Sequence, residues 1–357
     1  MLNIANISLE LTKRCTNACQ YCYWGDKNAD REYVKDKDCT IEYARQVLDW
    51  VVLPEVSGNN PRVSVCLFGG EPLLKFDLMK EIVDYAKTIT TKRIGFSVTS
   101  NGVLLNEEIM NFLLENNIRI DPYSIDGDKE TNDTHRKLAN GQGSFDEMMK
   151  YLPEFLKRQK SNVARMTVTP ITCNKMFQNI KYIIEELNFD YIAPSLVSDS
   201  PEGVPTLADW NETALKELDE QYSLLEQWLG ERIEKRVPNA ICIGYVQKNI
   251  NYILNNSPMQ SPCGAGKGYL GVSVDGIFPC HRFTNWMEWK LGDIKDKDNL
   301  DFEKINKFRQ YNRDINSPSC KNCPNYFCGG NCFAANYAYS KDICVVNPTI
   351  CKANVFL

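Results

Sequence analysis

The sequence predicts an α/β fold in which parallel strands form a partial barrel, followed by a small cysteine-rich domain. Six short β-rich runs alternate with amphipathic stretches, which is the rhythm of repeated βα units. Six strands are too few for a full eight-stranded barrel, so we expect a partial (β/α)6 barrel or an open parallel sheet. In such folds, ligands bind at the C-terminal ends of the strands.

The elements can be placed in order along the chain. The strand candidates are Ile4–Leu11, Val63–Phe68, Ile94–Thr99, Ile118–Ile125, Ala164–Pro170 and Tyr191–Val197. Apolar residues at helical spacing predict helices near residues 41–51, 76–86 and 109–113. A polar helix is expected over about 208–236 and another helix over 241–254. With a turn-rich break at 200–205, this order predicts a core over residues 1–200, a helical linker over 201–256 and a cysteine-rich domain over 257–357.

Composition narrows the class of protein. The chain has 357 residues and a net charge of −5, with Lys and Arg scattered rather than grouped, so we expect no nucleic-acid partner. No apolar stretch is long enough to span a membrane, so we expect no membrane partner. The N-terminus lacks the basic and apolar segments of a signal peptide. We therefore expect a cytoplasmic protein.

Cysteine is the most informative residue type. The chain has fifteen cysteines but only two histidines, which favours metal–sulfur ligation over disulfides or mixed Cys/His zinc sites. Cys15, Cys19 and Cys22 form a tight C-x3-C-x2-C run directly after the first predicted strand. Three ligands leave one iron of a [4Fe–4S] cluster open to a substrate or cofactor. The alternatives for this run are a zinc knuckle or buried thiols.

This spacing, with Tyr21 just before the last cysteine, resembles the signature of the radical S-adenosylmethionine (SAM) family. The resemblance implies that the three cysteines hold a [4Fe–4S] cluster whose fourth iron binds SAM, which is cleaved to a 5′-deoxyadenosyl radical. Further segments resemble family segments that line the SAM site, although each is also an ordinary turn and the arginine could be a solvated helix residue. Together with Tyr21, these implied cofactor-binding residues are Gly69, Gly70, Glu71, Pro72, Ser100, Asn101, Ser124, Asp126 and Arg136.

The late cysteines resemble a SPASM domain, which carries two auxiliary [4Fe–4S] clusters. Asp275-Gly276 predicts a hairpin that brings Cys263 and Cys280 together. The resemblance implies one cluster on Cys263, Cys280 and Cys332, and another on Cys320, Cys323, Cys328 and Cys351. Three clusters with SAM on one would leave the motif one ligand short. Cys344, Cys242 or a substrate cysteine could fill that place.

SPASM proteins mostly modify peptides or small proteins, so the resemblance implies a peptide substrate. In anaerobic sulfatase maturases an aspartate follows the hairpin cysteine and serves as a base. This chain has His281 there, which could accept a proton or cap the hairpin. The segment Pro279–Phe283 more closely resembles maturases of ribosomally made peptides that form thioether or carbon–carbon crosslinks, so we favour that class. The alternatives are formylglycine formation on a sulfatase, and a non-catalytic iron–sulfur electron carrier or zinc scaffold.

The expected partners follow from this class. A radical SAM enzyme needs an electron donor, such as flavodoxin or ferredoxin. Many peptide maturases carry a peptide-recognition domain before the radical core, whereas the first strand here is predicted to start at Ile4. We therefore expect any leader peptide to bind elsewhere on the chain or to a separate leader-peptide-binding protein.

Overall fold

The computed structural model describes residues 2–25, 37–199, 207–255, 259–296, 299–321, 323, 325 and 328–355. The chain divides into two compact units, each built from separate stretches of sequence. The first unit comprises Met1–Thr16, Lys27–Asp121 and Gly264–Tyr311. The second comprises Asn17–Asp26, Pro122–Cys263 and Asn312–Leu357. The predicted boundaries at 200 and 256, and the turn-rich break at 200–205, lie outside the described residues, so the three-domain division stays a prediction.

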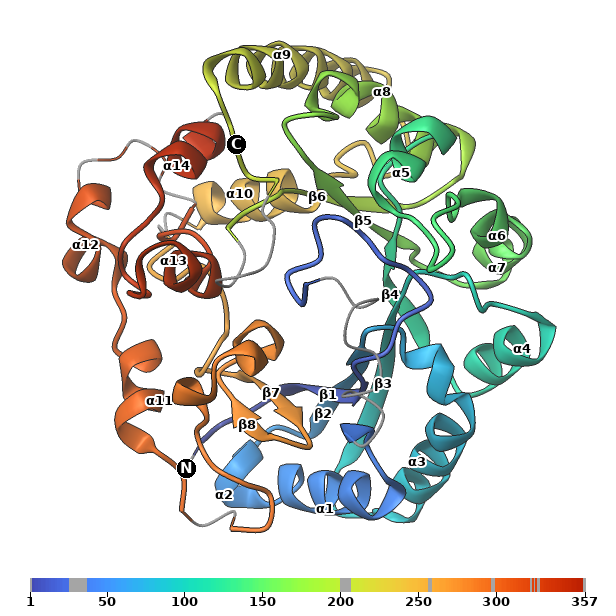
Figure 1. Ribbon diagram of the computed structural model, residues 1–357, viewed down its shortest axis with the longest axis vertical. Coiled ribbons are helices and arrows are strands. Elements are labelled where there is room, and N and C mark those ends of the chain that lie inside the picture. Colours follow the sequence, from blue (N-terminus) through green and yellow to red (C-terminus); the bar gives the residue numbers. More distant parts are fainter. Residues whose placement is uncertain are drawn as a thin grey trace. The chain divides into compact units, whose positions relative to one another are not determined.

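In the first unit the strands lie in the order β3-β2-β1-β7-β8 (Figure 1). Strands β1, β2 and β3 are parallel, β7 joins β1 in parallel, and β8 closes an antiparallel hairpin with β7. The C-terminal hairpin thus extends the sheet that the N-terminal strand begins. The bounds are β1 (Asn6–Thr12), β2 (Arg62–Gly69), β3 (Arg93–Ser100), β7 (Tyr269–Ser273) and β8 (Gly276–Phe278).

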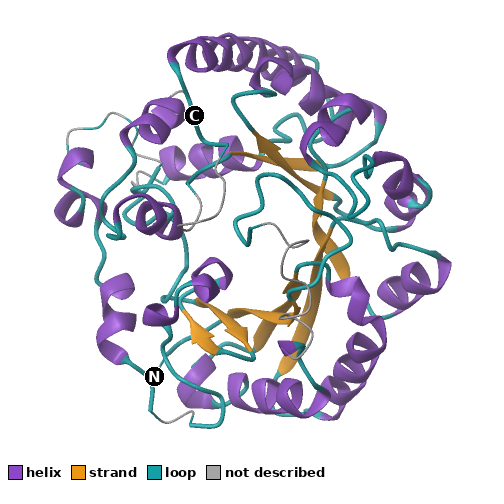
Figure 2. Ribbon diagram, in the orientation of Figure 1, coloured by secondary structure: helices purple, strands orange, loops and turns teal. Residues whose placement is uncertain are grey.

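In the second unit, β5 lies between β4 and β6, and all three strands are parallel. The division between the units falls within β4, after Asp121. Helices α6, α7 and α8 lie on one side of these strands, as the colours of Figure 2 make clear. The bounds are β4 (Arg119–Ser124), β5 (Val163–Val168) and β6 (Tyr191–Leu196).

The helices follow the same division. Those of the first unit are α1 (Ile41–Val51), α2 (Pro54–Ser57), η2 (Pro72–Lys75), α3 (Phe76–Thr88), α4 (Glu107–Glu115), η5 (His281–Asn285), η6 (Met287–Trp289) and α11 (Phe302–Arg309). Those of the second unit are α5 (Lys129–His135), α6 (Phe145–Met149), α7 (Leu152–Arg158), η3 (Cys173–Lys175), α8 (Met176–Lys181), η4 (Tyr182–Glu186), α9 (Glu212–Glu234), α10 (Gly244–Leu254), α12 (Arg313–Asn316), η7 (Pro318–Cys320), α13 (Phe333–Ser340) and α14 (Pro348–Val355).

Polar side chains determine where several helices begin. Thr40 accepts a hydrogen bond from the backbone of Tyr43 and starts α1, while Asn211 accepts one from Ala214 and starts α9. Such caps satisfy N–H groups that the first helical turn leaves without a partner. The same role is played at other helices by Asn106, Asp128 and Asp301.

The two faces of the central strands differ. On β2, Val63, Val65 and Leu67 are fully buried, and helices α1 and α3 lie beside the sheet (Figure 1). The intervening Cys66 and Phe68 are only half-buried. Because alternate side chains of a strand point to opposite faces, one face forms the core and the other is left for the site.

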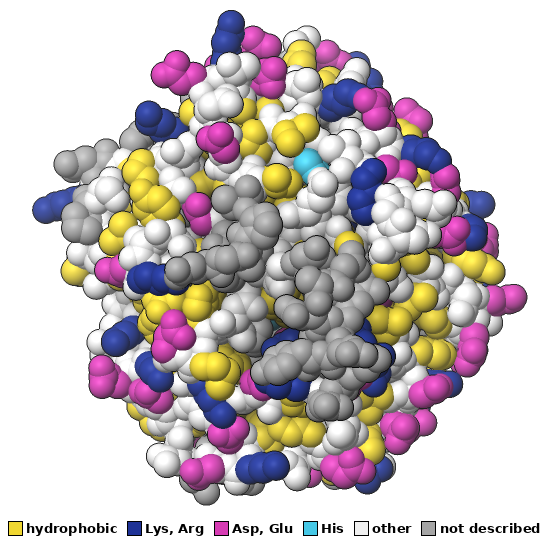
Figure 3. Space-filling model, viewed as in Figure 1, with side chains coloured by type: hydrophobic (Ala, Val, Ile, Leu, Met, Phe, Trp, Pro, Cys, Tyr) yellow, Lys and Arg dark blue, Asp and Glu magenta, His cyan; other side chains and the backbone are white. Residues whose placement is uncertain are grey.

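The parallel α/β fold and all six predicted strands are confirmed, with ends shifted by one or two residues. The attachment of β7 to β1 was not predicted, and neither were the short helices of the cysteine-rich segment. Within the described residues, no helix is long and apolar enough to cross a membrane. Figure 3 shows basic and acidic side chains interspersed on the face that it draws. Lys129 and Asp146 form one of the exposed ion pairs of the second unit.

Candidate active site

In the first unit, the first cysteine of the N-terminal motif lies against two other predicted motifs. The Cys15 thiol donates to the carbonyl oxygen of Gly70 at 3.3 Å. The side-chain amide of Asn101 lies 3.6 Å from Cys15 Sγ and donates to Thr16 Oγ1 at 3.0 Å. The segments that follow β1, β2 and β3 therefore meet at the C-terminal ends of these strands, as parallel-sheet folds predict.

Gly69 and Gly70 permit a very close approach of two backbone segments. A Cβ added at Gly69 would lie 2.2 Å from the carbonyl oxygen of Thr12, and one at Gly70 would lie 2.2 Å from that of Arg14. Gly69 also has a φ of +147°, which strongly favours glycine. The N–H groups of Gly70 and Glu71 donate to these same two carbonyls, each at 2.8 Å. The glycines thus position the backbone that leads into Cys15.

Glu71 connects the loops that follow β2 and β3. Its side chain is fully buried. Oε1 accepts hydrogen bonds from Ser100 Oγ at 2.9 Å and from the backbone of Leu73 at 3.1 Å. Oε2 accepts one from the backbone of Asn101 at 2.8 Å. Pro72 follows as the first residue of η2. The carboxylate therefore fixes the shape of the predicted SAM-binding loops.

In the second unit, Tyr21, Asp126 and Arg136 form a buried polar network. Arg136 Nη1 donates to the Tyr21 hydroxyl at 2.7 Å, and that hydroxyl donates to Asp126 Oδ2. Asp126 Oδ1 accepts from the backbone N–H of Thr167 at 2.9 Å. Arg136 is 7% exposed, so the alternative of a solvated helix-face arginine is wrong.

The electrostatics of this network keep a cation beside Cys19. Burial raises the pKa of Asp126 and also that of Tyr21, with the positive charge of Arg136 opposing both shifts. Burial alone would lower the pKa of Arg136, but its interactions with Tyr21, Cys19 and Asp126 outweigh burial and raise it. A guanidinium held charged beside a cysteine of the motif suits an anionic cluster or a carboxylate ligand.

The loop that carries Cys19 is held by the two neighbours of Arg136, His135 and Lys137, which the sequence analysis did not single out. His135 Nδ1 lies 2.8 Å from Gln20 Oε1, and Nε2 lies 2.9 Å from Thr169 Oγ1. The backbones of Ala18 and Gln20 donate to the carbonyls of Lys137 and His135. The rarity of histidine in this chain was the only signal that could have pointed to this residue.

Ser124 is the last residue of β4, where it pairs with Arg165 of β5. The side chain is half-buried. Ser124 therefore lies at the C-terminal end of a strand, as the sequence predicted. Its contact with SAM stays a prediction.

His281 lies in the first unit, directly after the hairpin cysteine Cys280. Its Nδ1 is 2.6 Å from the hydroxyl oxygen of Tyr269, and its ring centroid is 4.5 Å from that of Phe68. Phe68 projects from the half-buried face of β2, which places His281 on the side of the sheet opposite the helical core. Tyr269 is a site neighbour that the sequence analysis missed.

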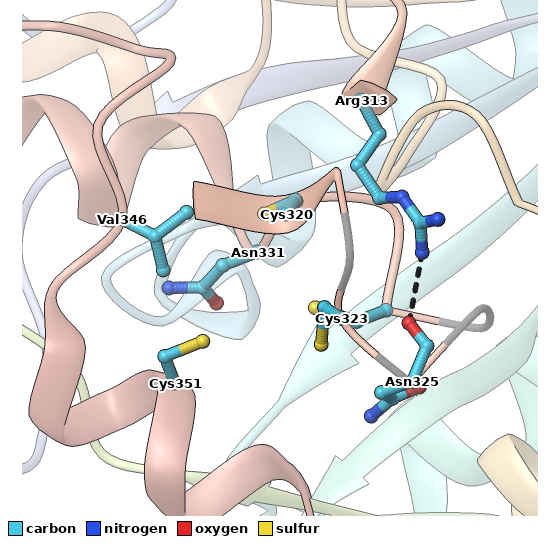
Figure 4. A pocket seen from close by; sticks show the side chains of 9 residues that line it. Arg313, Cys320, Cys323, Asn325, Asn331, Val346 and Cys351 are labelled. Carbon is cyan, nitrogen blue, oxygen red and sulfur yellow. Dashed lines mark hydrogen bonds between the residues drawn. The ribbon is translucent and has the colours of Figure 1, made fainter. Parts of the chain in front are cut away.

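In the second unit, four late cysteines line one cavity. Cys320, Cys323, Cys328 and Cys351 surround it together with residues that include Arg313, Asn325 and Asn331 (Figure 4). Burial raises the pKa of Cys351 to about 11, and the nearby Cys328, Cys320 and Cys323 add to the shift. The four predicted ligands of one auxiliary cluster are therefore brought together.

The donor set of this cavity fits an iron–sulfur cluster. Within the part of the chain that the structure describes, no three Cys, His, Asp or Glu side chains are gathered closely enough to hold a single metal ion. The four cysteines line one cavity, and a multi-iron cluster needs its ligands around a shared space. Thiolate donors without histidine are also the set that such clusters use.

The remaining late cysteines are placed less decisively. The predicted ligands of the first auxiliary cluster are Cys263, Cys280 and Cys332. Cys332 is the residue before α13, and Cys263 and Cys280 belong to different units. The cluster on these three cysteines therefore stays a prediction. Cys344 is not among the lining residues of the four-cysteine cavity; burial and the adjacent Asp342 raise its pKa to about 11. Cys242 is fully buried.

Residues 9–180 match the family model of the radical SAM superfamily. This match covers just under half of the chain, identifies a radical SAM domain and confirms the resemblance of the N-terminal motif, which argues against a non-catalytic electron carrier or zinc scaffold. The family implies a [4Fe–4S] cluster and SAM as cofactors. The cysteines after β1 offer three thiolate donors for such a cluster.

Two enzymes resemble the chain over most of its length. It is 25% identical over 350 residues to the cysteine-type anaerobic sulfatase-maturating enzyme of Clostridium novyi, covering 93% of this chain and 88% of that protein. It is 24% identical over 352 residues to the radical SAM cyclopropyl synthase TigE of Paramaledivibacter caminithermalis, covering 93% and 68%. The solved structure of native anSMEcpe with bound AdoMet and Cp18Cys peptide shares the fold, with a TM-score of 0.76, 18% identity and coverage of 98% and 94%.

Proposed function

We propose that this chain is a peptide-modifying radical SAM enzyme that carries three [4Fe–4S] clusters. The observation that carries the proposal is the cavity lined by Cys320, Cys323, Cys328 and Cys351, which supplies a complete cysteine set outside the matched radical SAM domain. A second cluster site in a chain that also contains a radical SAM domain suits an oxidation, because an electron released from the substrate needs an acceptor.

The residues of the N-terminal site would act mainly by binding and positioning. Cys15, Cys19 and Cys22 would hold the first cluster, which together with SAM supplies a carbon radical able to remove hydrogen from an unactivated C–H bond. Arg136 would hold its positive charge beside Cys19, a location suited to the SAM carboxylate. Glu71 would keep the loops after β2 and β3 in the shape that receives the cofactor.

The names of the similar proteins support a peptide or protein substrate. One relative matures sulfatases and another is a cyclopropyl synthase, and the similar solved structure holds a peptide. Sulfatase maturation and crosslinking of a ribosomally made peptide both remain consistent with these likenesses, so the choice between them depends on the site.

The surroundings of His281 support the crosslinking reaction. The Nδ1 atom of His281 lies 2.6 Å from the hydroxyl oxygen of Tyr269. One ring nitrogen of His281 therefore has a tyrosine partner, and the residue differs in kind from the aspartate expected at this position in sulfatase maturases. We therefore propose a thioether or carbon–carbon crosslink as the product.

SAM cleavage tests the enzymatic part of the proposal. The reconstituted chain, supplied with SAM and dithionite without oxygen, should release 5′-deoxyadenosine, measured by chromatography. Cys19→Ala should abolish release. Cys39→Ala is the matched control, because burial raises the pKa of Cys39 to about 12 and its thiol donates to the Thr40 carbonyl. Absence of 5′-deoxyadenosine from the iron-loaded wild type would refute the proposed activity.

The choice of reaction can be tested with two kinds of peptide. A serine-containing sulfatase peptide and small peptides encoded beside this gene are incubated with enzyme, SAM and reductant, then treated with a hydrazide. We expect the second group to lose two hydrogens without reacting with the hydrazide, as a crosslink does. Conversion of the sulfatase peptide to a hydrazide-reactive aldehyde would instead establish formylglycine formation.

A further inference from the structure

We propose that Arg313 raises the reduction potential of the cluster held by Cys320, Cys323, Cys328 and Cys351. The inference rests on the proposed function, because it needs a cluster in the four-cysteine cavity. It adds a positioning residue that the cysteine motif does not contain. The reaction concerned is the gain of one electron by the oxidised cluster, either from the substrate-derived radical or from a chemical reductant.

Arg313 is a buried cation in the wall of this cavity. It begins α12, and its side chain is only 3% exposed. Figure 4 shows the guanidinium beside the loop that carries Cys323, and Arg313 is among the residues that line the cavity. A charged side chain is seldom buried to this extent unless it forms an ion pair or lies beside a group of opposite charge.

The bonding of Arg313 directs it toward the cluster loop. Nη1 donates to the carbonyl oxygen of Asn325 at 2.8 Å, and Asn325 lies between Cys323 and Cys328 in the sequence. Nε and Nη2 donate to Asp314 Oδ1 at 2.9 and 2.8 Å. Asp314 is 41% exposed, so water screens its charge more than that of the buried guanidinium.

The sign of the effect follows from charge. A [4Fe–4S] cluster with four thiolates is an anion, and one-electron reduction makes it more negative by one unit. A fixed cation in a poorly solvated wall stabilises the reduced form more than the oxidised form. Arginine is protonated at every accessible pH, so the contribution of Arg313 is constant. Removing its charge should therefore make reduction harder.

The same side chain also holds the ligand loop, so the test must separate charge from bonding. Arg313→Gln removes the charge and retains an amide donor. Arg313→Lys retains the charge and loses the planar guanidinium with its several N–H donors. Lys235→Gln is the matched control for net charge, because Lys235 is 69% exposed and pairs with Glu231 on α9. All three are made in the full chain with Cys15, Cys19, Cys22 and Cys280 replaced by alanine, which leaves one intact cluster site.

The measurement is a redox titration of the reconstituted protein, followed by electron paramagnetic resonance of the reduced cluster. Iron content is measured first: a background protein without about four irons would refute the cluster itself and thus the proposed function. With the cluster present, Arg313→Gln should shift the midpoint to a more negative potential by about 59 mV or more, a tenfold change for one electron. Lys235→Gln and Arg313→Lys should stay near the parent value.

Two results would overturn the inference while leaving the cluster in place. One is an iron-loaded Arg313→Gln protein with the parent potential. The other is an Arg313→Lys protein shifted by a tenfold change or more, since its charge is retained. If Arg313→Gln fails to hold iron, the lysine variant decides alone: a potential near the parent value supports the charge effect, and a shifted one rejects it.

Discussion

The carboxylate of Glu71 accepts a hydrogen bond of 2.8 Å from the backbone N–H of Asn101, and so joins the loop after β2 to the loop after β3. Asn101 in turn reaches Thr16 and lies 3.6 Å from Cys15 Sγ. One buried acid thus links two loops that lie thirty residues apart in the sequence to the start of the cysteine motif. The predicted SAM-binding loops form a connected unit rather than a set of independent turns.

Replacing Glu71 by glutamine should weaken this unit. One of the oxygens that accept from Ser100, Leu73 and Asn101 becomes an amide NH2, which leaves a buried donor facing a donor. We expect a loss of about 2 kcal/mol in unfolding free energy, measured by urea denaturation, together with weaker SAM binding. Glu115→Gln, at an exposed position in α4, should change neither. A Glu71→Gln protein as stable as the wild type would disprove the role.

Gly70→Ala tests the close approach of the backbone to Arg14. The added Cβ would lie 2.2 Å from the Arg14 carbonyl oxygen, so the loop must move away from the cysteine motif. We expect a loss of about 2 kcal/mol or more in stability and a loss of cluster iron. Gly230→Ala is the control: beyond its chain neighbours and the nearby helix backbone, no atom lies within 4 Å of a Cβ added there, and alanine in α9 should stabilise by up to about 1 kcal/mol. Equal responses of the two variants would contradict the explanation.

Asp38 should make the protein sensitive to acid. Burial alone would raise the pKa of this carboxyl, but hydrogen bonds from Lys75, Thr12 and Arg14 outweigh burial and lower it. A lowered folded-state pKa contributes stability above the unfolded value of about 4. That stability disappears as the pH falls through the folded-state pKa.

Asp38→Asn removes this contribution, so the wild type should lose more stability than the variant on acidification below about pH 4. We expect a difference under about 1 kcal/mol, because solvent screens such pairs. The measurement is urea denaturation across the pH series. Asp77→Asn, at a side chain 92% exposed, serves as the control. A wild type and Asp38→Asn with parallel pH profiles would show that the ion pairs contribute nothing.

Two late cysteines should respond differently to substitution. Cys351 lines the four-cysteine cavity, whereas Cys344 does not and lies beside Asp342. Cys351→Ala should therefore lower the iron content by about four per chain, while Cys344→Ala should leave it unchanged. Iron is measured after anaerobic reconstitution, with circular dichroism confirming the fold. Loss of iron from Cys344→Ala would identify this residue as the missing cluster ligand.

Much of the fold was predictable because its signals are local. The six strands and the helices near 41–51 and 76–86 follow from apolar periodicity, and Thr40 and Asn211 are caps that sequence can reveal. The parallel pairing of β7 with β1 was not predictable. It joins residues that are far apart in the sequence, such as Asn6 and Tyr269, and the local sequence around a strand does not indicate which distant strand it will pair with.

The candidate site shows the same limit. Its cysteines and glycines have recognisable spacing, so their roles could be predicted from a resemblance. The supporting residues His135, Tyr269 and Arg313 carry no motif, and they become visible only when folding places them beside Gln20, His281 and Asn325. The role of a residue that positions a site depends on its neighbours in the folded structure, and a single sequence does not reveal which residues those are.

The iron content of the anaerobically reconstituted full chain tests the central claim most directly. Three four-iron clusters predict about twelve irons per chain, with the amount of protein fixed by amino-acid analysis. A value near four would leave only the cluster of the N-terminal motif, and would contradict both the auxiliary clusters and the oxidative peptide chemistry proposed here.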